Sequence, residues 1–137
     1  MSVIKEALDT IAQSLRERGE RNVYTVFDAL PSEHKGRLFT TVGISGMDIS
    51  RPVYSLGNIY IPFRAETEIK LTSPESAGSA VLLEHFSSCT EPALETMSGM
   101  TCRLTKLTLK HDTSLGRLVL CAGFTVTGIS IHERTGI

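Results

Sequence analysis

The chain has 137 residues, of which 41% are hydrophobic and 21% are charged, proportions typical of a globular protein and not of a disordered one. That length suits one domain with a buried core, so we expect a single domain over residues 1–137. The formal net charge is −1, whereas a domain that holds nucleic acid by its phosphates normally carries a basic excess. The charge balance therefore argues against direct nucleic-acid binding.

The cysteines are odd in number and far apart in the chain: Cys89, Cys102 and Cys121. A small secreted domain more often carries an even set of disulfides, so we expect these thiols to be reduced. The first residues are charged every few positions and lack the apolar run of a signal peptide. No apolar stretch reaches the roughly 18 residues that a membrane span needs. We therefore expect a cytoplasmic protein without a membrane segment.

The clearest predicted element is a helix over residues 3–18. Its apolar positions repeat at spacings of four, three and four, on one helical face: Ile4, Leu8, Ile11 and Leu15. Gly19 follows where a residue of left-handed conformation often ends a helix. The β-branched and aromatic composition of residues 22–30 predicts a first strand, and residues 37–44 predict a second.

Two polar connections are candidates for interaction. Residues 45–58 contain Gly46, Pro52 and Gly57, which predict a loop, and residues 111–116 join two later strands. Structureless connections of more than about twelve residues usually have a function. We therefore expect these two loops to take part in contacts with other proteins.

The longest predicted strand covers residues 59–71. Its odd positions, from Ile59 to Leu71, are mostly apolar, whereas its even positions include a run of charged residues. Such alternation is typical of an antiparallel strand with one buried face and one solvated face. Pro62 has no N–H to donate, so it predicts an edge or a bulge at this end of the strand.

The remaining elements are a second helix and a hairpin. Ser73 and Pro74 have the composition of a helix start, and the helix is expected to run towards Cys89, with Pro92 breaking or restarting it. Residues 101–111 and 117–131 then predict two antiparallel strands. The apolar residues of the last strand share one face: Leu118, Leu120, Ala122, Phe124 and Val126.

The order of these elements is α-β-β-β-α-β-β, which predicts an α+β domain with a mainly antiparallel sheet of about five strands. Because each helix has one apolar face, both helices are expected to pack on the same face of the sheet. The helical residues expected to face the odd positions of the long strand are Ile4, Leu8, Ile11, Leu15, Val81 and Phe86.

No sequence motif identifies a catalytic, metal-binding or cofactor-binding site. His85 and Cys89 have the spacing of two metal ligands on a helix, but the other histidines and cysteines form no ligand pattern. A satisfied or exposed histidine beside a buried cysteine is the expected arrangement. No nucleophile elbow, phosphate-binding glycine loop or dinucleotide fingerprint occurs. We expect no enzymatic activity, no bound metal and no cofactor.

Charged residues of the long strand and of the last hairpin are candidates for subunit contacts: Arg64, Glu66, Glu68, Lys70, Asp112 and Arg117. Two interpretations stay open for the strand residues. They are either a solvated sheet surface, where each ion pair contributes about 0–1 kcal/mol, or a mixed-charge face that binds a neighbouring subunit.

The succession of elements resembles that of phage tail terminator (tail completion) proteins and related neck proteins of prophages. The resemblance rests on the opening helix before Asn22-Val-Tyr-Thr-Val-Phe, on the long strand followed by Ser73-Pro74, and on the closing Phe124-Thr-Val-Thr-Gly-Ile129. It covers most of the chain as a pattern of elements without an invariant motif.

The resemblance implies a non-enzymatic virion structural protein that caps the end of the tail. It implies a homo-oligomeric ring, which could be a hexamer, that contacts other phage tail or connector proteins. Such a protein would be cytoplasmic in the host cell and part of the virion once assembled. The alternative is a small cytoplasmic ligand- or protein-binding module.

Overall fold

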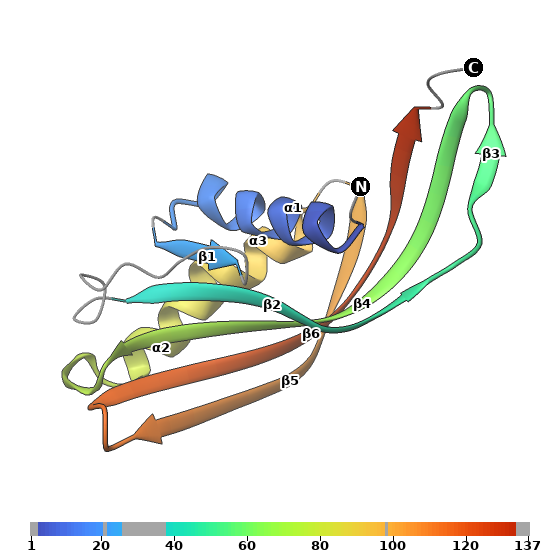
Figure 1. Cartoon of the computed structure of the whole chain (residues 1–137). Helices are drawn as coiled ribbons and strands as arrows, with labels where there is room; N and C mark the ends of the chain where they lie inside the picture. The colour runs from blue at the N-terminus through green and yellow to red at the C-terminus, as the bar shows by residue number, and fades with distance from the viewer. Residues whose placement is uncertain (1–2, 21, 26–37, 98, 134–137) are drawn as a thin grey trace.

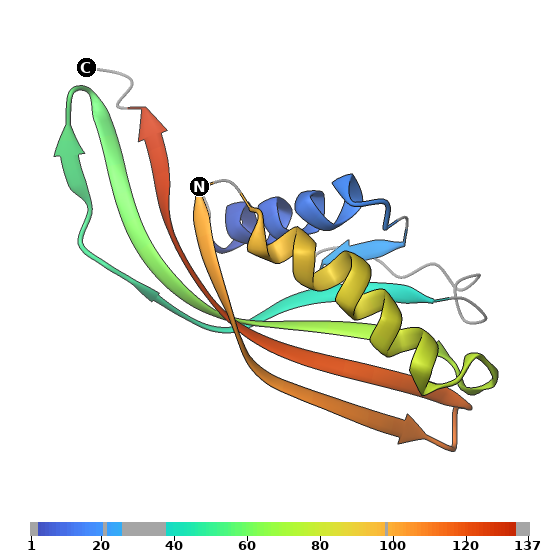
Figure 2. The same cartoon turned by 180° about the vertical axis from the view of Figure 1, so that it is seen from behind.

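The computed structural model describes residues 3–20, 22–25, 38–97 and 99–133, which form a twisted sheet with all helices on one face (Figures 1 and 2). The strand order is β1-β2-β4-β6-β5, and β3 pairs with β4. All pairs are antiparallel except β1 with β2. The elements are α1 (Val3–Glu17), β1 (Val23–Thr25), β2 (Phe39–Ile49), β3 (Val53–Ser55), β4 (Asn58–Pro74), η2 (Glu75–Ala77), α2 (Ser79–His85), η3 (Phe86–Thr90), α3 (Glu91–Glu95), β5 (Met100–Asp112) and β6 (Arg117–Glu133).

The core lies between the helices and the sheet, which confirms the predicted α+β class and the placement of both helical segments on one face. α1 contacts β1 and β2, whereas α2 contacts β4 and β6. The aromatic rings of Phe86 and Phe124 lie with their centroids 6.3 Å apart. Buried residues of the helices, β4 and β6 include Leu8, Ile11, Leu15, Leu82, Phe86, Ile69, Leu71, Leu120, Phe124 and Val126.

Two of the predicted core residues are exposed instead. Ile4 is 40% exposed because, in the first turn of α1, the neighbouring Val3 and not Ile4 packs against the buried residues Ala7, Phe63 and Ala65. Val81 is 48% exposed because the buried face of this helix is formed by Leu82 and Phe86, and Val81 points away from it. The odd positions of β4 from Phe63 onwards are buried as predicted.

The second helix begins later than predicted. Ser73 and Pro74 belong to β4, where Ser73 is buried, and α2 begins only after Gly78, whose φ is +83°. The helix then passes through the π-type turn η3 directly before Pro92. Proline clashes with the carbonyl four residues earlier in a regular α-helix, and a π-type turn relieves such a clash. Pro92 therefore restarts the helix without ending it, and Figure 2 shows one continuous rod.

The predicted loop over residues 45–58 is wrong. β2 continues to Ile49, and β3 forms a hairpin with β4 around Leu56 and Gly57. Gly46 was read as a loop residue because glycine is frequent in turns, but here it follows a β-bulge inside a strand. In the predicted 22–30 strand, β1 covers Val23–Thr25, and residues 26–30 lie outside the described part of the chain.

Two bulges bend the sheet at one level. β2 shifts register between Ile44 and Gly46, and β5 shifts between Leu104 and Lys106. Ile44 pairs with Thr67 and Leu104 pairs with Phe124, which are themselves partners, so both bulges flank the same rung of the sheet. Bulges increase bend and twist. Beyond them the sheet curves away from its own plane and past the N-terminus of α1 (Figure 1).

The curved end of the sheet is a three-stranded projection that we name the arm. It consists of β3, residues 58–62 of β4 and residues 129–133 of β6. Pro62 lies at the base of the arm, in a central strand and not at the predicted edge. Its carbonyl accepts a hydrogen bond from the Ser50 N–H at 2.9 Å, between the β2 and β3 ladders. The N–H that Pro62 lacks would therefore lie where the partner of β4 changes from β3 to β2.

Candidate interaction surface on the projecting arm

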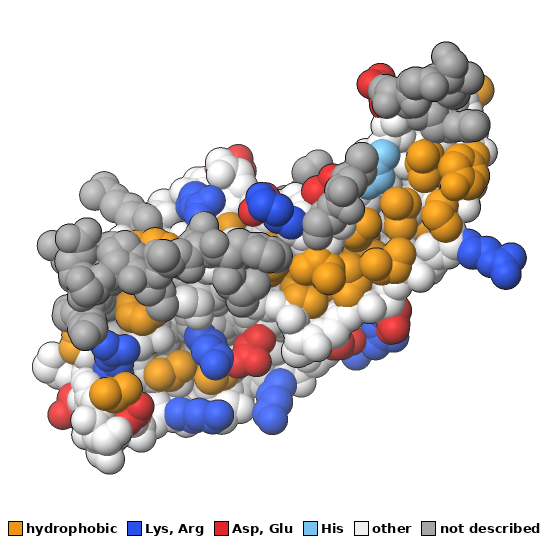
Figure 3. All heavy atoms as spheres, viewed as in Figure 1, with side chains coloured by type: hydrophobic (Ala, Val, Ile, Leu, Met, Phe, Trp, Pro, Cys, Tyr) orange, Lys and Arg blue, Asp and Glu red, His pale blue; other side chains and the backbone are white. Residues whose placement is uncertain are grey.

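The arm carries an unusual number of exposed apolar side chains for a solvent-facing surface. Six large ones are more than half exposed on or beside it: Ile49, Val53, Tyr54, Leu56, Ile129 and Ile131. Figure 3 shows hydrophobic side chains gathered along this end of the molecule. Contiguous exposed apolar surface marks sites of interaction in soluble proteins.

Both faces of the arm are apolar, unlike the body of the sheet. In the body, the face opposite the helices, here named the outer face, carries Arg64, Glu66, Glu68 and Lys70. In the arm the same face carries Tyr60 and Pro62, which pair with Ile131 and Ile129. No described helix lies over this part of the sheet (Figure 1). Ile129 and Ile131 are more than half exposed, whereas Tyr60 and Pro62 are half-buried.

In the last strand the apolar residues switch from even-numbered to odd-numbered positions, and this switch is the sign of the surface in the sequence. From Leu118 to Val126 the apolar positions are even-numbered, but after Gly128 they are odd-numbered, at Ile129 and Ile131. Because successive residues of a strand point to opposite faces, the change moves the apolar side chains to the outer face. The prediction of a single apolar face missed this signal.

Leu56 forms the tip of the arm. It is 98% exposed, and its φ of +49° is the one positive φ at a described residue other than glycine. Leu56 and Gly57 are the two central residues of a tight hairpin, both with φ above zero, where Asn-Gly is the preferred pair. A fully exposed leucine in a conformation that leucine disfavours is a candidate contact residue.

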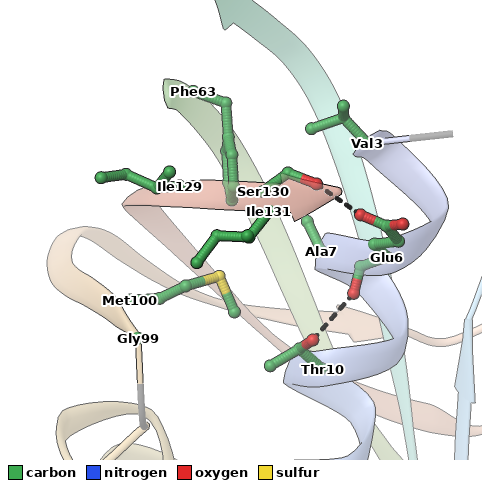
Figure 4. Close-up of a pocket in the computed structure, with 10 residues that line it drawn as sticks. All are labelled: Val3, Glu6, Ala7, Thr10, Phe63, Gly99, Met100, Ile129, Ser130 and Ile131. Atoms are coloured by element: carbon green, nitrogen blue, oxygen red, sulfur yellow. Dashed lines mark hydrogen bonds between the residues drawn. The ribbon is translucent and has the colours of Figure 1, made fainter. Parts of the chain in front are cut away.

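A pocket of about 330 Å³ lies at the base of the arm, between α1 and β6 (Figure 4). The Ser130 hydroxyl donates a hydrogen bond to the Glu6 carboxylate across this space, and the Thr10 hydroxyl donates to the Glu6 carbonyl. Apolar and polar surface contribute about equally to its lining, which consists of Val3, Glu6, Ala7, Thr10, Phe63, Gly99, Met100, Ile129, Ser130 and Ile131.

The predicted charged contacts of the outer face lie side by side along β4. Arg64 Nε is 3.5 Å from Glu66 Oε1, and Lys70 Nζ is 3.4 Å from Glu68 Oε1. These four side chains are about half exposed, so each pair contributes little to stability. Beyond β6, the edge strand β5 adds a basic row to the same face, Arg103, Lys106 and Lys110. The uneven distribution of charge was not visible in the net charge.

Asp112 and Arg117 lie at the opposite end of the molecule, at the β5–β6 hairpin, where they pair in register. The Asp112 carboxylate accepts hydrogen bonds from the Ser114 hydroxyl at 2.7 Å and from the Leu115 N–H at 3.2 Å. These bonds, with the Arg117 charge nearby, hold the pKa of Asp112 below its ordinary value. The structure thus gives Asp112 a local role in shaping the turn, and its role in subunit contacts stays a prediction.

Of the two residues considered as metal ligands, His85 has another partner, and Cys89 is half-buried and not buried as expected. His85 Nε2 lies 2.8 Å from Glu20 Oε1, which also accepts a hydrogen bond from Thr90 at 2.9 Å. Glu20 and Thr90 are buried, so this contact connects the end of α1 to the π-type turn. Within the described residues, no group of three or more histidine, cysteine or acidic side chains could hold a metal ion. The described part of the chain also contains no helix long and apolar enough to cross a membrane.

The comparisons with known proteins give a likeness of fold. No protein-family model matches this chain, and no curated protein matches it. Among solved structures, the chain is similar to a chain of the virion of a native gene transfer agent (GTA) particle. The two share 12% sequence identity with a TM-score of 0.58, over 95% of this chain and 100% of the other. At this identity the likeness concerns the fold, and it extends over the whole of the gene transfer agent chain.

Proposed function

We propose that this protein is a non-enzymatic virion structural subunit of a phage-like particle, a tail terminator or neck subunit that assembles into a ring at the end of the tail. The observation that carries the proposal is the arm, a projection with apolar side chains on both faces and no covering layer. Exposed apolar surface of this extent is stabilised when another subunit covers it.

Two further observations support the proposal. The fold is similar to that of a chain in a gene transfer agent virion, a phage-like particle. In addition, the sheet has unpaired ends on both sides, since β5 ends the strand order and β3 pairs with β4 alone among the described strands. Edge strands are prone to pair with other chains unless they are protected. Head-to-tail contacts between such subunits generate closed rings when the rotation closes.

The charged outer face and the hairpin with Asp112 and Arg117 are the other contact surfaces that we propose. In a ring, a surface that does not contact the neighbouring copy is available to the tail tube or the connector. The charged residues are suited to such contacts because mixed charges favour specificity and register.

Light scattering and electron microscopy of the purified protein test the proposal. The expected result is a ring of one defined copy number that binds to one end of isolated tail tubes. A monomeric mass at all concentrations, with no ring in the presence of tail tubes, would contradict it. A monomer that instead binds a small molecule in the pocket beside α1 would favour the alternative of a ligand-binding module.

A further inference from the structure

The tip of the arm and the pocket at its base belong to the same chain but cannot meet within one molecule. Leu56 precedes Asn58 at the far end of the arm, whereas the pocket includes Phe63, Ile129 and Ile131 at its base. Five residues of extended strand separate Asn58 from Phe63, which corresponds to about 17 Å. Any contact between tip and pocket is therefore a contact between two copies.

We propose that Leu56 of one copy inserts into the pocket between α1 and β6 of a second copy. This inference deepens the proposed function, on which it rests, by naming the contact that joins neighbouring subunits. The occupant is a leucine side chain with the flanking apolar residues Val53 and Tyr54, which are exposed on the same hairpin.

The chemistry of the two surfaces is complementary. The pocket combines apolar side chains, among them Ala7, Phe63 and Met100, with a comparable share of polar surface, and at about 330 Å³ it has room for a leucine side chain. Its polar part includes Glu6, whose carboxylate accepts a hydrogen bond from the Ser130 hydroxyl and lies 3.7 Å from His132 Nε2. The apolar part of the lining is therefore what a leucine side chain would contact.

The backbone edges support the same arrangement. β5 begins at Met100, which pairs with Gly128, so residues 129–133 of β6 have no strand partner on that side among the described strands. This edge borders the pocket (Figure 4). The outer edge of β3 is also unpaired in the described chain. A second copy that brings its arm to the pocket thus brings one strand edge to another, as in β-strand addition.

Leu56→Asn is the most informative variant, because it separates folding from association. Asparagine tolerates positive φ, and Asn-Gly is favoured in this type of turn, so the monomer should be as stable as the wild type or more stable. The variant removes the apolar side chain, so the concentration at which copies associate should rise about tenfold or more. Analytical ultracentrifugation over a concentration series measures the shift, and thermal unfolding at low concentration checks the fold.

Two more variants complete the experiment. Thr10→Trp fills the pocket from the exposed side of α1, and it should weaken association to a similar degree without touching the tip. Val81→Glu places a charge on the exposed surface of α2, away from the arm, and it should leave association unchanged. Like Leu56, Val81 has an exposed apolar side chain.

The outcomes distinguish the inference from the proposed function. If wild type forms a ring and both Leu56→Asn and Thr10→Trp form it equally well, the tip-to-pocket contact is wrong while the ring stands. If the wild type forms only an assembly of two copies, and both variants abolish it, the tip-to-pocket contact is supported but the proposed ring is wrong. A wild type that is monomeric at all concentrations overturns both.

Discussion

Leu56 shows how one side chain can oppose the preference of its own backbone. A residue other than glycine held at positive φ costs about 1–3 kcal/mol, and burial normally compensates for such strain. Here the side chain is 98% exposed, so the monomer gains no burial from it. The pairing of Ser55 with Asn58 in the hairpin holds this conformation, so the exposure of the apolar side chain is the reason to propose this residue for a contact.

Cys102 provides a pH-dependent test of packing between β5 and the helices. Burial, with a smaller contribution from the Glu95 charge, raises the pKa of the Cys102 thiol from 9.0 to about 12. Below the unfolded pKa both states keep the proton, and this contribution to stability is fully present. As the pH rises from about 9 to about 12, the unfolded chain loses the proton first, so the stability is progressively lost.

We therefore expect wild type to lose more stability than Cys102→Ala when the pH is raised through this window. Urea unfolding at about pH 8 and about pH 10.5 measures the two losses, and comparing them cancels the titration of lysine and tyrosine residues common to both proteins. An equal loss in the two proteins would show that the Cys102 thiol titrates normally.

At the scale of elements, the arm depends on the junction where it leaves the body. Gly128 lies there between Phe63 and Met100, and a Cβ added at Gly128 would be 2.7 Å from Met100 Cγ and 3.0 Å from Phe63 Cζ. The absence of a side chain lets β6 approach both residues. Gly128 also marks the position where the apolar residues of β6 change face.

Gly128→Ala is expected to lower the free energy of unfolding by about 1–3 kcal/mol, the usual cost of overpacking. Gly46→Ala is the matched control, since a Cβ at Gly46 would have nothing within 4 Å and its φ is not in the left-handed region. Urea unfolding of both variants at low concentration provides the comparison. Similar stabilities for the two would mean that Met100 and Phe63 move aside without cost.

For the whole molecule, the balance between apolar and charged contacts decides how assembly responds to salt. The outer-face charges of Arg64, Glu66, Glu68 and Lys70 pair along their own strand and are about half exposed. Salt screens exposed charges, with a Debye length of about 3 Å at 1 M, whereas apolar burial is not weakened.

We expect the assembled protein to keep its mass when the salt concentration is raised to about 1 M. Light scattering at several salt concentrations provides the measurement, with the protein concentration held constant. A mass that falls steadily as salt rises would instead identify the charged residues of the outer face as the main contacts between subunits.

Much of the body could be predicted because burial there follows local periodicity. Leu8, Ile11 and Leu15 repeat at helical spacing and are buried, and the alternation from Phe63 to Leu71 matches the two faces of β4. The helix start at Ser73 was wrong, since a favourable capping sequence was overridden by the pairing of Ser73 and Pro74 with β6. That pairing joins residues far apart in the chain, which local propensity does not describe.

The sequence by itself determined the class of the fold and the helix-facing side of the sheet, because periodicity decides which side chains share a face. Only the tertiary structure decided that residues 49–62 and 129–133 form a projection instead of a loop and a covered strand. Whether an apolar strand residue is buried depends on what lies above it. The two bulges turn this end of the sheet away from α2 and α3, so Ile129, Ile131 and Leu56 remain exposed.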